Sequence, residues 1–291
     1  MTTLQAALSG ALVGGMFAVM AAGLSLTWGM LRVINLAHFG LILVGAYLTF
    51  ELATSWGIDP ILTIVLTVPL MFLVGAGLQW AFDRLGVEEF ASLLVSFGLL
   101  IIVMQTVSNV WSADFQRMDG DVNPYATESV SIGRFVFPAP TLIAFVFAVV
   151  IVVAADQVLR RTFAGRALRA FAEDRTVASA FGIDHRRLGM VLAGLSAASA
   201  AVAGMLFALG NAVTPSTPFE WIGMVFAVVI LGGIGQVGGV LLAGVLVGTL
   251  SAVVSATWSP ALSPLVLFSA IILALLFRPY GLLTPAARGA R

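Results

Sequence analysis

The sequence contains no cysteine and no lysine, and its only two histidines are His38 and His185. Without cysteine, the chain can form neither a disulfide framework nor a thiolate metal site. Without lysine, a Walker-type phosphate loop is excluded, because that loop needs a lysine after its glycines. Two histidines on separate segments do not make a metal site, and no serine nucleophile motif with a partner histidine is present. We therefore expect no catalytic residue, no metal site and no cofactor on this chain.

Charge is scarce as well. Charged residues make up 10% of the 291 residues and hydrophobic residues 60%, whereas an ordinary soluble domain carries about 25% charge. The formal net charge is zero, which gives no case for binding nucleic acid through a basic surface. This composition predicts an integral membrane protein embedded in a lipid bilayer.

Nine apolar segments follow one another along the chain. Eight come close to the roughly 20 residues that a helix needs to cross a bilayer, and one is short. Their apolar residues recur with a helical period rather than alternating. The segments are residues 6–28, 36–56, 61–82, 90–111, 139–159, 188–210, 221–233, 237–257 and 261–277. The sequence thus predicts an all-α, polytopic membrane bundle of about eight to nine transmembrane segments in a single domain, residues 1–291.

The arginines predict the orientation of the bundle. Half of the 14 basic residues lie in the stretch 160–187, and short loops rich in arginine stay in the cytoplasm. Counting segments outward places the loop 112–138, which carries four acidic residues against Arg117 and Arg134, outside the cell. The amino terminus is then outside and the carboxyl terminus inside. The first segment lacks a preceding basic region, so we expect it to be retained as a span.

The short segment 221–233 ends in a glycine-rich break. Glycine weakens a helix and frees backbone groups, which at membrane depth must be buried in protein or line a wet cavity. Further glycines recur at Gly244 and Gly248, and at Gly10 and Gly14 in the first segment. Two interpretations are open: close packing of helices, which small residues allow, or a mobile helix that lines a substrate pathway.

The charged stretch 160–187 has an internal order. Asp174 is placed to cap a short helix over residues 177–181, Gly182 to end it, and Asp184 to cap the next span. Such a helix would present apolar residues to a protein partner. The alternative is a loop held to anionic lipid headgroups by its arginines, but the acids Glu173 and Asp174 favour a protein interface of mixed charge.

Asn35 and His38 lie three residues apart, on one helical face where the second segment begins. Asn35 is either the cap of that helix or a pathway residue. His38 either satisfies a neighbouring carbonyl group or lines a pathway. No carboxylate is placed near the middle of the membrane, as a proton- or sodium-driven carrier would require. This absence favours a transport energy source outside this chain.

Four blocks of sequence carry a resemblance to a known family. In chain order they are INLAH at 34–38 with GAY at 45–47, GRALRAFAED at 165–174 with ASAFGI at 178–183, LGGIG at 231–235 with Gly239, and RPYGL at 278–282. Together they resemble branched-chain amino acid ABC transporter permeases of the LivH type, over nearly the whole chain.

The resemblance implies a fold related to the ten-helix ABC importer permeases, and no enzymatic activity in this chain. It implies a multi-pass protein of the bacterial inner membrane. Its partners would be a second permease subunit (LivM-like) or a second copy, two cytoplasmic ATPases that hold ATP and magnesium, and an external substrate-binding protein. Other members transport urea, amides or other amino acids. From another class, an ATP-independent secondary carrier or channel stays open, as does a scaffold that transports nothing.

Two sets of site residues are expected, the first from the resemblance and the second from the polar and glycine residues discussed above. The residues expected to contact an ATPase are Gly165, Arg166, Arg169, Glu173, Asp174, Ala178, Phe181, Gly182 and Ile183. The residues expected along the translocation pathway are Asn35, His38, Gly232, Gly233, Gly235, Gln236 and Gly239.

Overall fold

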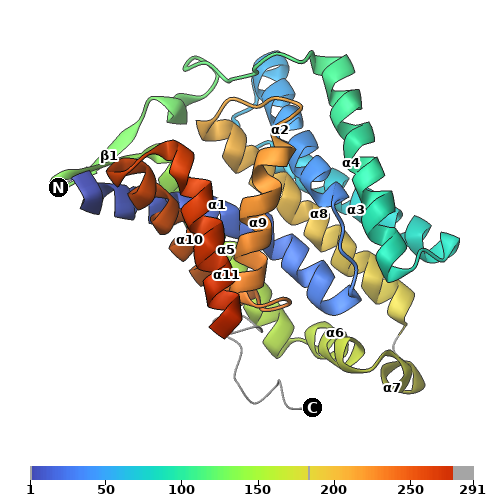
Figure 1. Cartoon of the computed structure of the whole chain (residues 1–291). Coiled ribbons are helices and arrows are strands. Elements are labelled where there is room, and N and C mark those ends of the chain that lie inside the picture. The colour runs from blue at the N-terminus through green and yellow to red at the C-terminus, as the bar shows by residue number, and fades with distance from the viewer. Residues whose placement is uncertain (1, 183, 278–291) are drawn as a thin grey trace.

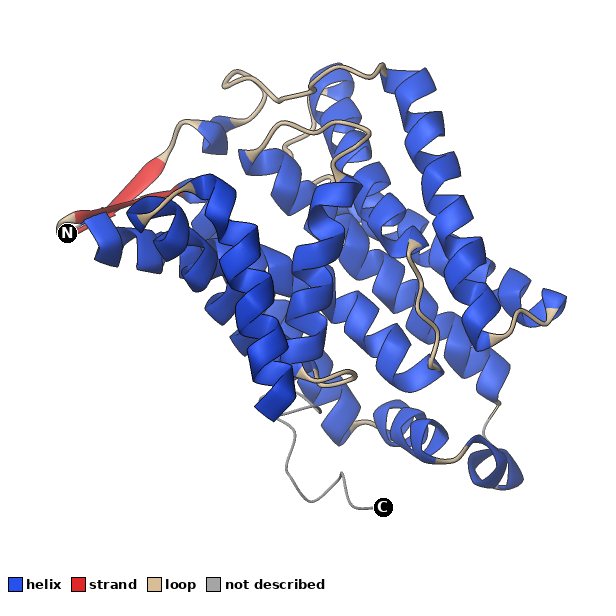
Figure 2. Ribbon diagram, in the orientation of Figure 1, coloured by secondary structure: helices blue, strands red, loops and turns tan. Residues whose placement is uncertain are grey.

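The computed structural model describes residues 2–182 and 184–277, and this part of the chain is mainly helical (Figures 1 and 2). Seven of its helices are long and apolar enough to cross a membrane. They are α1 (Thr2–Leu31), α2 (Ala37–Trp56), α3 (Ile64–Leu85), α4 (Glu89–Trp111), α5 (Ala139–Arg161), α8 (His185–Gly210) and α10 (Val237–Thr257). The prediction of a polytopic helical bundle is confirmed.

The remaining elements are short. Two apolar helices, α9 (Pro218–Gly232) and α11 (Ser263–Phe277), have 15 residues each. Two more helices, α6 (Phe163–Glu173) and α7 (Arg175–Ala180), lie in the arginine-rich stretch, and β1 (Ser129–Ile132) pairs with β2 (Phe135–Pro138) as an antiparallel hairpin. The 3-10 turns are η1 (Pro124–Ala126) and η2 (Pro260–Leu262). The hairpin and α6 were not predicted, and α11 is shorter than its apolar segment because η2 takes up its start.

Helices α1, α2, α8 and α10 form the interior of the bundle. Ala18, Val19, Met20 and Ala21 in α1 are completely buried, as are several residues of α2 and α8 in the same core cluster. Helices α3 and α4 lie at the edge and leave apolar side chains such as Leu73 exposed. In a bilayer these exposed faces meet lipid, which is as apolar as leucine.

Four glycines let α1 and α10 touch backbone to backbone. A β-carbon on Gly14 would overlap the carbonyl oxygen of Gly244, and a β-carbon on Gly248 would overlap the carbonyl oxygen of Gly10. Small residues at such positions allow helices to approach closely in a membrane. At these four glycines the structure shows close packing of helices, the first of the two interpretations of the glycine pattern.

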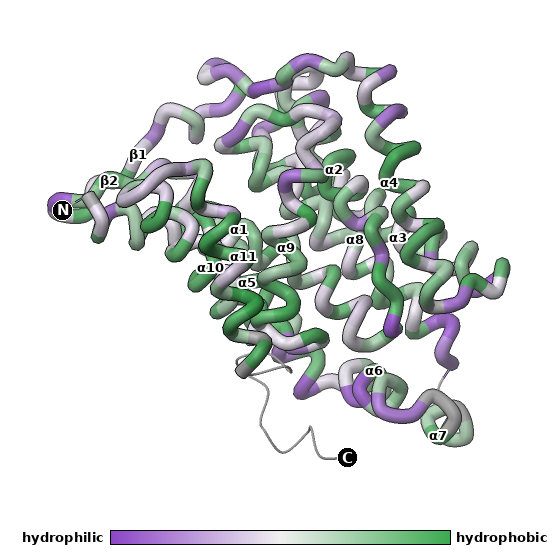
Figure 3. The backbone as a smooth tube through the Cα atoms, in the orientation of Figure 1, coloured by the Kyte–Doolittle hydropathy of each residue, from purple (hydrophilic) through white to green (hydrophobic). Residues whose placement is uncertain are grey.

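The bundle has two polar ends (Figure 3). We call the end with residues 112–138 the hairpin side and the end with residues 160–187 the arginine side. On the hairpin side, Gln116 and Val213 exchange two backbone hydrogen bonds of 2.9 and 2.8 Å. The Asn123 side chain donates to the carbonyl of Leu209 at 2.8 Å. These bonds hold the segment 112–138 against the end of α8.

A further bond ties the hairpin side to the connection between α2 and α3. The hydroxyl group of Tyr125 donates to the carboxylate of Asp59 at 2.9 Å. This hydrogen bond, together with burial and the negative charge of Asp59, raises the pKa of Tyr125. The Tyr125 hydroxyl therefore keeps the proton that it donates at neutral pH, and the segment is attached to two connections of the bundle.

Candidate functional site

The arginine-rich stretch forms a compact unit, residues 163–182, which we call the platform (Figure 1). Its helix α6 has one buried face, made by Gly165, Ala167, Leu168 and Phe171. Leu168 and Phe171 belong to a buried apolar cluster with residues from α1, α5, α7, α8 and α10. Those residues are Ala22, Leu26, Met30, Leu31, Val152, Ala178, Leu192 and Val237. The platform is therefore packed against the ends of long helices.

Three residues predicted for ATPase contact attach α6 to α5. A β-carbon on Gly165 would overlap the backbone in the last two turns of α5. Arg166 donates from Nη1 to the carbonyl of Arg161 at 3.3 Å, and Arg169 donates from Nη2 to the carbonyl of Arg160 at 3.5 Å. A cation is favourable at a helix carboxyl end, where carbonyl groups lack partners. These residues anchor the platform.

The outward surface of the platform carries exposed apolar side chains. Phe181 is 83% exposed, Phe163 76% and Val177 53%. Glu173 is also exposed, whereas Ala178 lies on the buried face of α7. Exposed aromatic side chains on the polar end of a membrane protein are typical of a docking surface.

The turns around α7 follow the sequence prediction, with the helix beginning earlier than expected. The carboxylate of Asp174 accepts the N–H of Val177 at 3.0 Å, and Gly182 has a left-handed φ of 79° that ends the helix. Asp184 caps α8 through the N–H groups of its first turn. Ile183 lies outside the described residues.

Arg32 links the platform to the connection between α1 and α2. Its Nη2 donates to the carbonyl of Ala172 in α6 at 3.4 Å. The same connection is held by α4, because the Ser96 hydroxyl accepts the N–H of Leu36 at 2.9 Å and donates to the carbonyl of Ile34 at 3.3 Å. Neither Arg32 nor Ser96 was singled out from the sequence, since both contacts join segments far apart in the chain.

Asn35 and His38 lie at the start of α2. The Asn35 carboxamide accepts the N–H of Ala37 at 3.0 Å, as a cap does. His38 is buried, with Nε2 2.9 Å from the carbonyl of Met20 in α1 and Nδ1 3.3 Å from the hydroxyl of Ser196 in α8. His38 thus joins α1, α2 and α8. Asn35 has the bond expected of a helix cap, and His38 has a neighbouring carbonyl group as its partner.

The glycine break between α9 and α10 is packed backbone against backbone. A β-carbon on Gly239 would overlap the carbonyl of Gly232, and one on Gly29 in α1 would overlap Gly235. Gly235 also donates its N–H to Ser25 at 3.1 Å. Gly233 and Gly235 have φ of 89° and 81°, a region that favours glycine, and Gln236 precedes α10. The break between α9 and α10 is therefore packed against α1 and bonded to it.

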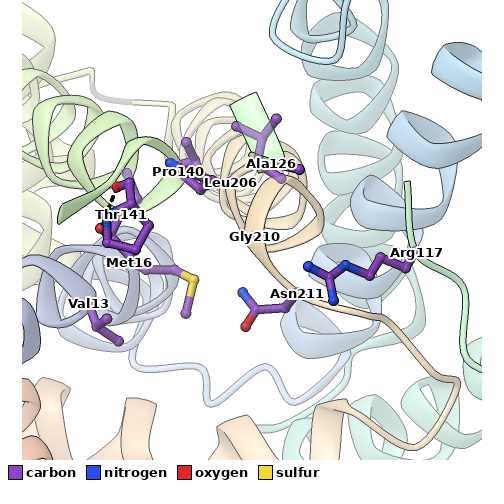
Figure 4. Close-up of a pocket in the computed structure, with 12 residues that line it drawn as sticks. Val13, Met16, Arg117, Ala126, Pro140, Thr141, Leu206, Gly210 and Asn211 are labelled. Carbon is purple, nitrogen blue, oxygen red and sulfur yellow. Dashed lines mark hydrogen bonds between the residues drawn. The ribbon is translucent and has the colours of Figure 1, made fainter. Parts of the chain in front are cut away.

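A cavity of about 320 Å³ lies on the hairpin side, between α1, α5 and α8 (Figure 4). Its apolar wall includes Met16 and Leu206, and its polar lining includes Arg117 and Asn211. This cavity was not predictable from the sequence, because its lining comes from four segments and carries no motif.

The comparison with known families covers most of the chain. The family model described as the permease component of the branched-chain amino acid transport system matches residues 6–276. The chain belongs to this permease family. Its members are transport membrane subunits, and the membership agrees with the multi-span bundle. No solved structure matches the chain significantly.

Three relatives illustrate the similarity of this permease to others. It is 27% identical to the high-affinity branched-chain amino acid transport system permease protein BraD of Pseudomonas aeruginosa, over 96% of this chain and 95% of that protein. The LivH permease protein of Salmonella typhimurium is 27% identical over the same shares. A probable LivH permease protein of Methanocaldococcus jannaschii is 26% identical over 83% of this chain and 78% of its own length.

The position of His38 in the permease gives a stability prediction. Substitution His38→Ala removes the hydrogen bond to the Met20 carbonyl and the contact with Ser196, and it opens a void between α1, α2 and α8. We expect a loss of about 1–3 kcal/mol, measured as a lower thermal midpoint of the purified protein in detergent. Ser196→Ala removes only the 3.3 Å contact and should shift the midpoint less. Equal shifts in the two variants would contradict this account.

Proposed function

We propose that this permease is the membrane-spanning subunit of an ATP-driven, binding-protein-dependent ABC importer for branched-chain amino acids. Family membership supports the transport role, and the names of the relatives support the substrate. The observation that supports an ATPase as the energy source is the platform. This unit is packed against the bundle and has outward-facing aromatic side chains at its polar end. The ATPases, with their ATP and magnesium, are separate subunits in this proposal.

The platform is built to transmit a push from an ATPase. Its outer surface is exposed at Phe163 and Phe181, while its inner face is packed on α1, α5 and α8. Arg32 adds a hydrogen bond from α6 to the start of the α1–α2 connection. Movement of the platform would therefore tilt the ends of these helices, and alternating access follows from switching between two such arrangements.

Helix α1 connects the predicted pathway residues. His38 bonds to the carbonyl of Met20, and the glycine break bonds to Ser25 and contacts Gly29. In this proposal a tilt of α1 moves both, so His38 and the break position the pathway, with Asn35 fixing the start of α2. Alanine substitutions at Asn35, His38 or Gln236 that leave uptake intact would remove those residues from the pathway.

The proposed orientation puts the arginine side in the cytoplasm of a bacterial cell and the hairpin side outside the inner membrane. The amino terminus is then external and the carboxyl terminus cytoplasmic. The external end would receive the substrate-binding protein, and a second permease subunit, or a second copy of this chain, would complete the membrane part.

Reconstitution tests the proposal against its main alternative. The complex, purified with its ATPases, second permease and binding protein, is placed in proteoliposomes and uptake of radiolabelled leucine is measured. We expect uptake only with ATP and binding protein present. Leucine uptake without ATP would favour a secondary carrier or channel, and uptake of urea in place of leucine would favour another branch of the family. A cross-link from the variant Phe181→Cys to an ATPase would support docking at the platform.

A further inference from the structure

The cavity on the hairpin side combines a deep apolar wall with polar groups at its opening. Met16, Ala144, Leu206 and Leu209 are buried residues that contribute to its lining. Arg117 and Asn211 are exposed residues of the lining, and the guanidinium group of Arg117 points toward Asn211 (Figure 4). A concave, mostly apolar site with a few convergent polar groups is the usual form of a small-molecule site, and about 320 Å³ lies at the small end of that range.

The two polar groups at the opening are chemically complementary to the two ends of an amino acid. The guanidinium group of Arg117 makes no hydrogen bond or ion pair with the residues that the structure describes, so its donors are available. An arginine binds a carboxylate through two parallel hydrogen bonds. Asn211 donates from Nδ2 to the carbonyl of Phe207 at 3.1 Å. This bond directs its Oδ1, an acceptor for an ammonium group, away from the helix.

The walls of the cavity are held in place independently of Arg117. The neighbouring residue Gln116 is fixed by its backbone bonds to Val213, and Asn123 bonds to Leu209. Gly210 allows a close approach to Pro140, whose Cβ would lie 3.2 Å from a β-carbon there. The site is therefore preformed, and Arg117 is free to bind without supporting the fold.

We propose that this cavity is a binding site for a zwitterionic aliphatic amino acid inside the permease subunit. Arg117 binds the carboxylate, Asn211 Oδ1 accepts from the ammonium group, and the wall of Met16 and Leu206 takes the aliphatic side chain. The proposal rests on the proposed function, because it supposes that a branched-chain amino acid enters from this side. It adds a binding site in the permease itself, which holds the free amino acid after its release from the binding protein.

Equilibrium binding tests the site. The complex of permeases and ATPases, without binding protein or ATP, is held in nanodiscs and titrated with radiolabelled leucine. We expect Arg117→Gln to weaken leucine binding at least tenfold, and Arg117→Lys to restore part of it through its positive charge. Leucinamide, which lacks the carboxylate, should not compete in the wild type. Arg134→Gln is the matched control, since it removes the other arginine of the same segment, and it should bind leucine like the wild type.

Three outcomes would overturn the site. Leucine binding that is unchanged in Arg117→Gln, with wild-type uptake intact, removes the site and leaves the proposed function standing. A phospholipid retained by the wild type and lost in Arg117→Gln, seen by native mass spectrometry, with leucine binding unchanged, assigns Arg117 to a lipid headgroup. Absence of leucine uptake by the wild-type complex overturns the proposed function and the site with it.

Discussion

Substitution Gly14→Val is expected to destabilise the bundle strongly. The added side chain would overlap the carbonyl group of Gly244. Because the two helix backbones are in contact there, no side-chain rotamer relieves the overlap. Helices α1 and α10 would have to separate. Overpacking costs about 1–3 kcal/mol or more, which corresponds to a drop in thermal midpoint on the order of 10 °C. Size-exclusion chromatography after heating, with a fluorescent fusion, measures this loss.

Gly77→Val provides the matched control. Gly77 lies inside α3, and a β-carbon there has no neighbour within 4 Å. Both substitutions place a valine within a long helix, so they share its effect on helix propensity. Similar losses in the two variants would mean that helix propensity, rather than contact between α1 and α10, is responsible.

Phe181→Ala is expected to weaken binding of the ATPase to the permease and, with it, transport. Phe181 is 83% exposed, so its removal leaves the packing of the permease intact. At a docking surface, however, a buried aromatic anchor contributes about 2 kcal/mol or more, which is roughly a 30-fold change in the Kd for the ATPase. Binding of the purified ATPase to the permeases in nanodiscs measures the Kd, and uptake in proteoliposomes measures the loss of transport.

Phe90→Ala is the control for this prediction. Phe90 lies in the first turn of α4 and is 76% exposed, so the substitution removes the same side chain from a similarly open position outside the platform. A loss of ATPase binding in Phe90→Ala as large as in Phe181→Ala would contradict docking through the platform, as would wild-type affinity in Phe181→Ala.

The transmembrane helices were predictable because lipid imposes a simple rule on them. All nine apolar segments correspond to helices, with ends that differ by about four residues or fewer. The short helix α9 was predicted as short, and its glycine break follows from Gly232 and Gly233. Helix α6 was missed because only one face is buried, so it adds little apolar sequence, and its packing depends on Gly165 meeting the backbone of α5.

The candidate site was only partly predictable, for a different reason. Asp174 and Gly182 act within one turn, where residue type determines the contact, and their roles were predicted from the sequence. The partner of His38 is a backbone carbonyl 18 residues away, and the acceptor of Arg32 lies in α6. Every residue has a backbone carbonyl group, so the sequence does not show which of them accepts a side-chain hydrogen bond. The cavity at Arg117 combines four segments, so no local pattern indicates it. The block 278–282 lies outside the described residues.

The glycine contact between α9 and α10 has a consequence for biogenesis. With 15 residues and a rise of 1.5 Å per residue, α9 is about 22 Å long, shorter than a hydrocarbon core of about 30 Å. Alone, it would leave backbone groups of its ends facing lipid. Gly232 and Gly239 let the two helices touch at the turn between them. Helices α9 and α10 can therefore enter the membrane together as a paired hairpin, in which the longer α10 compensates for the short apolar length of α9.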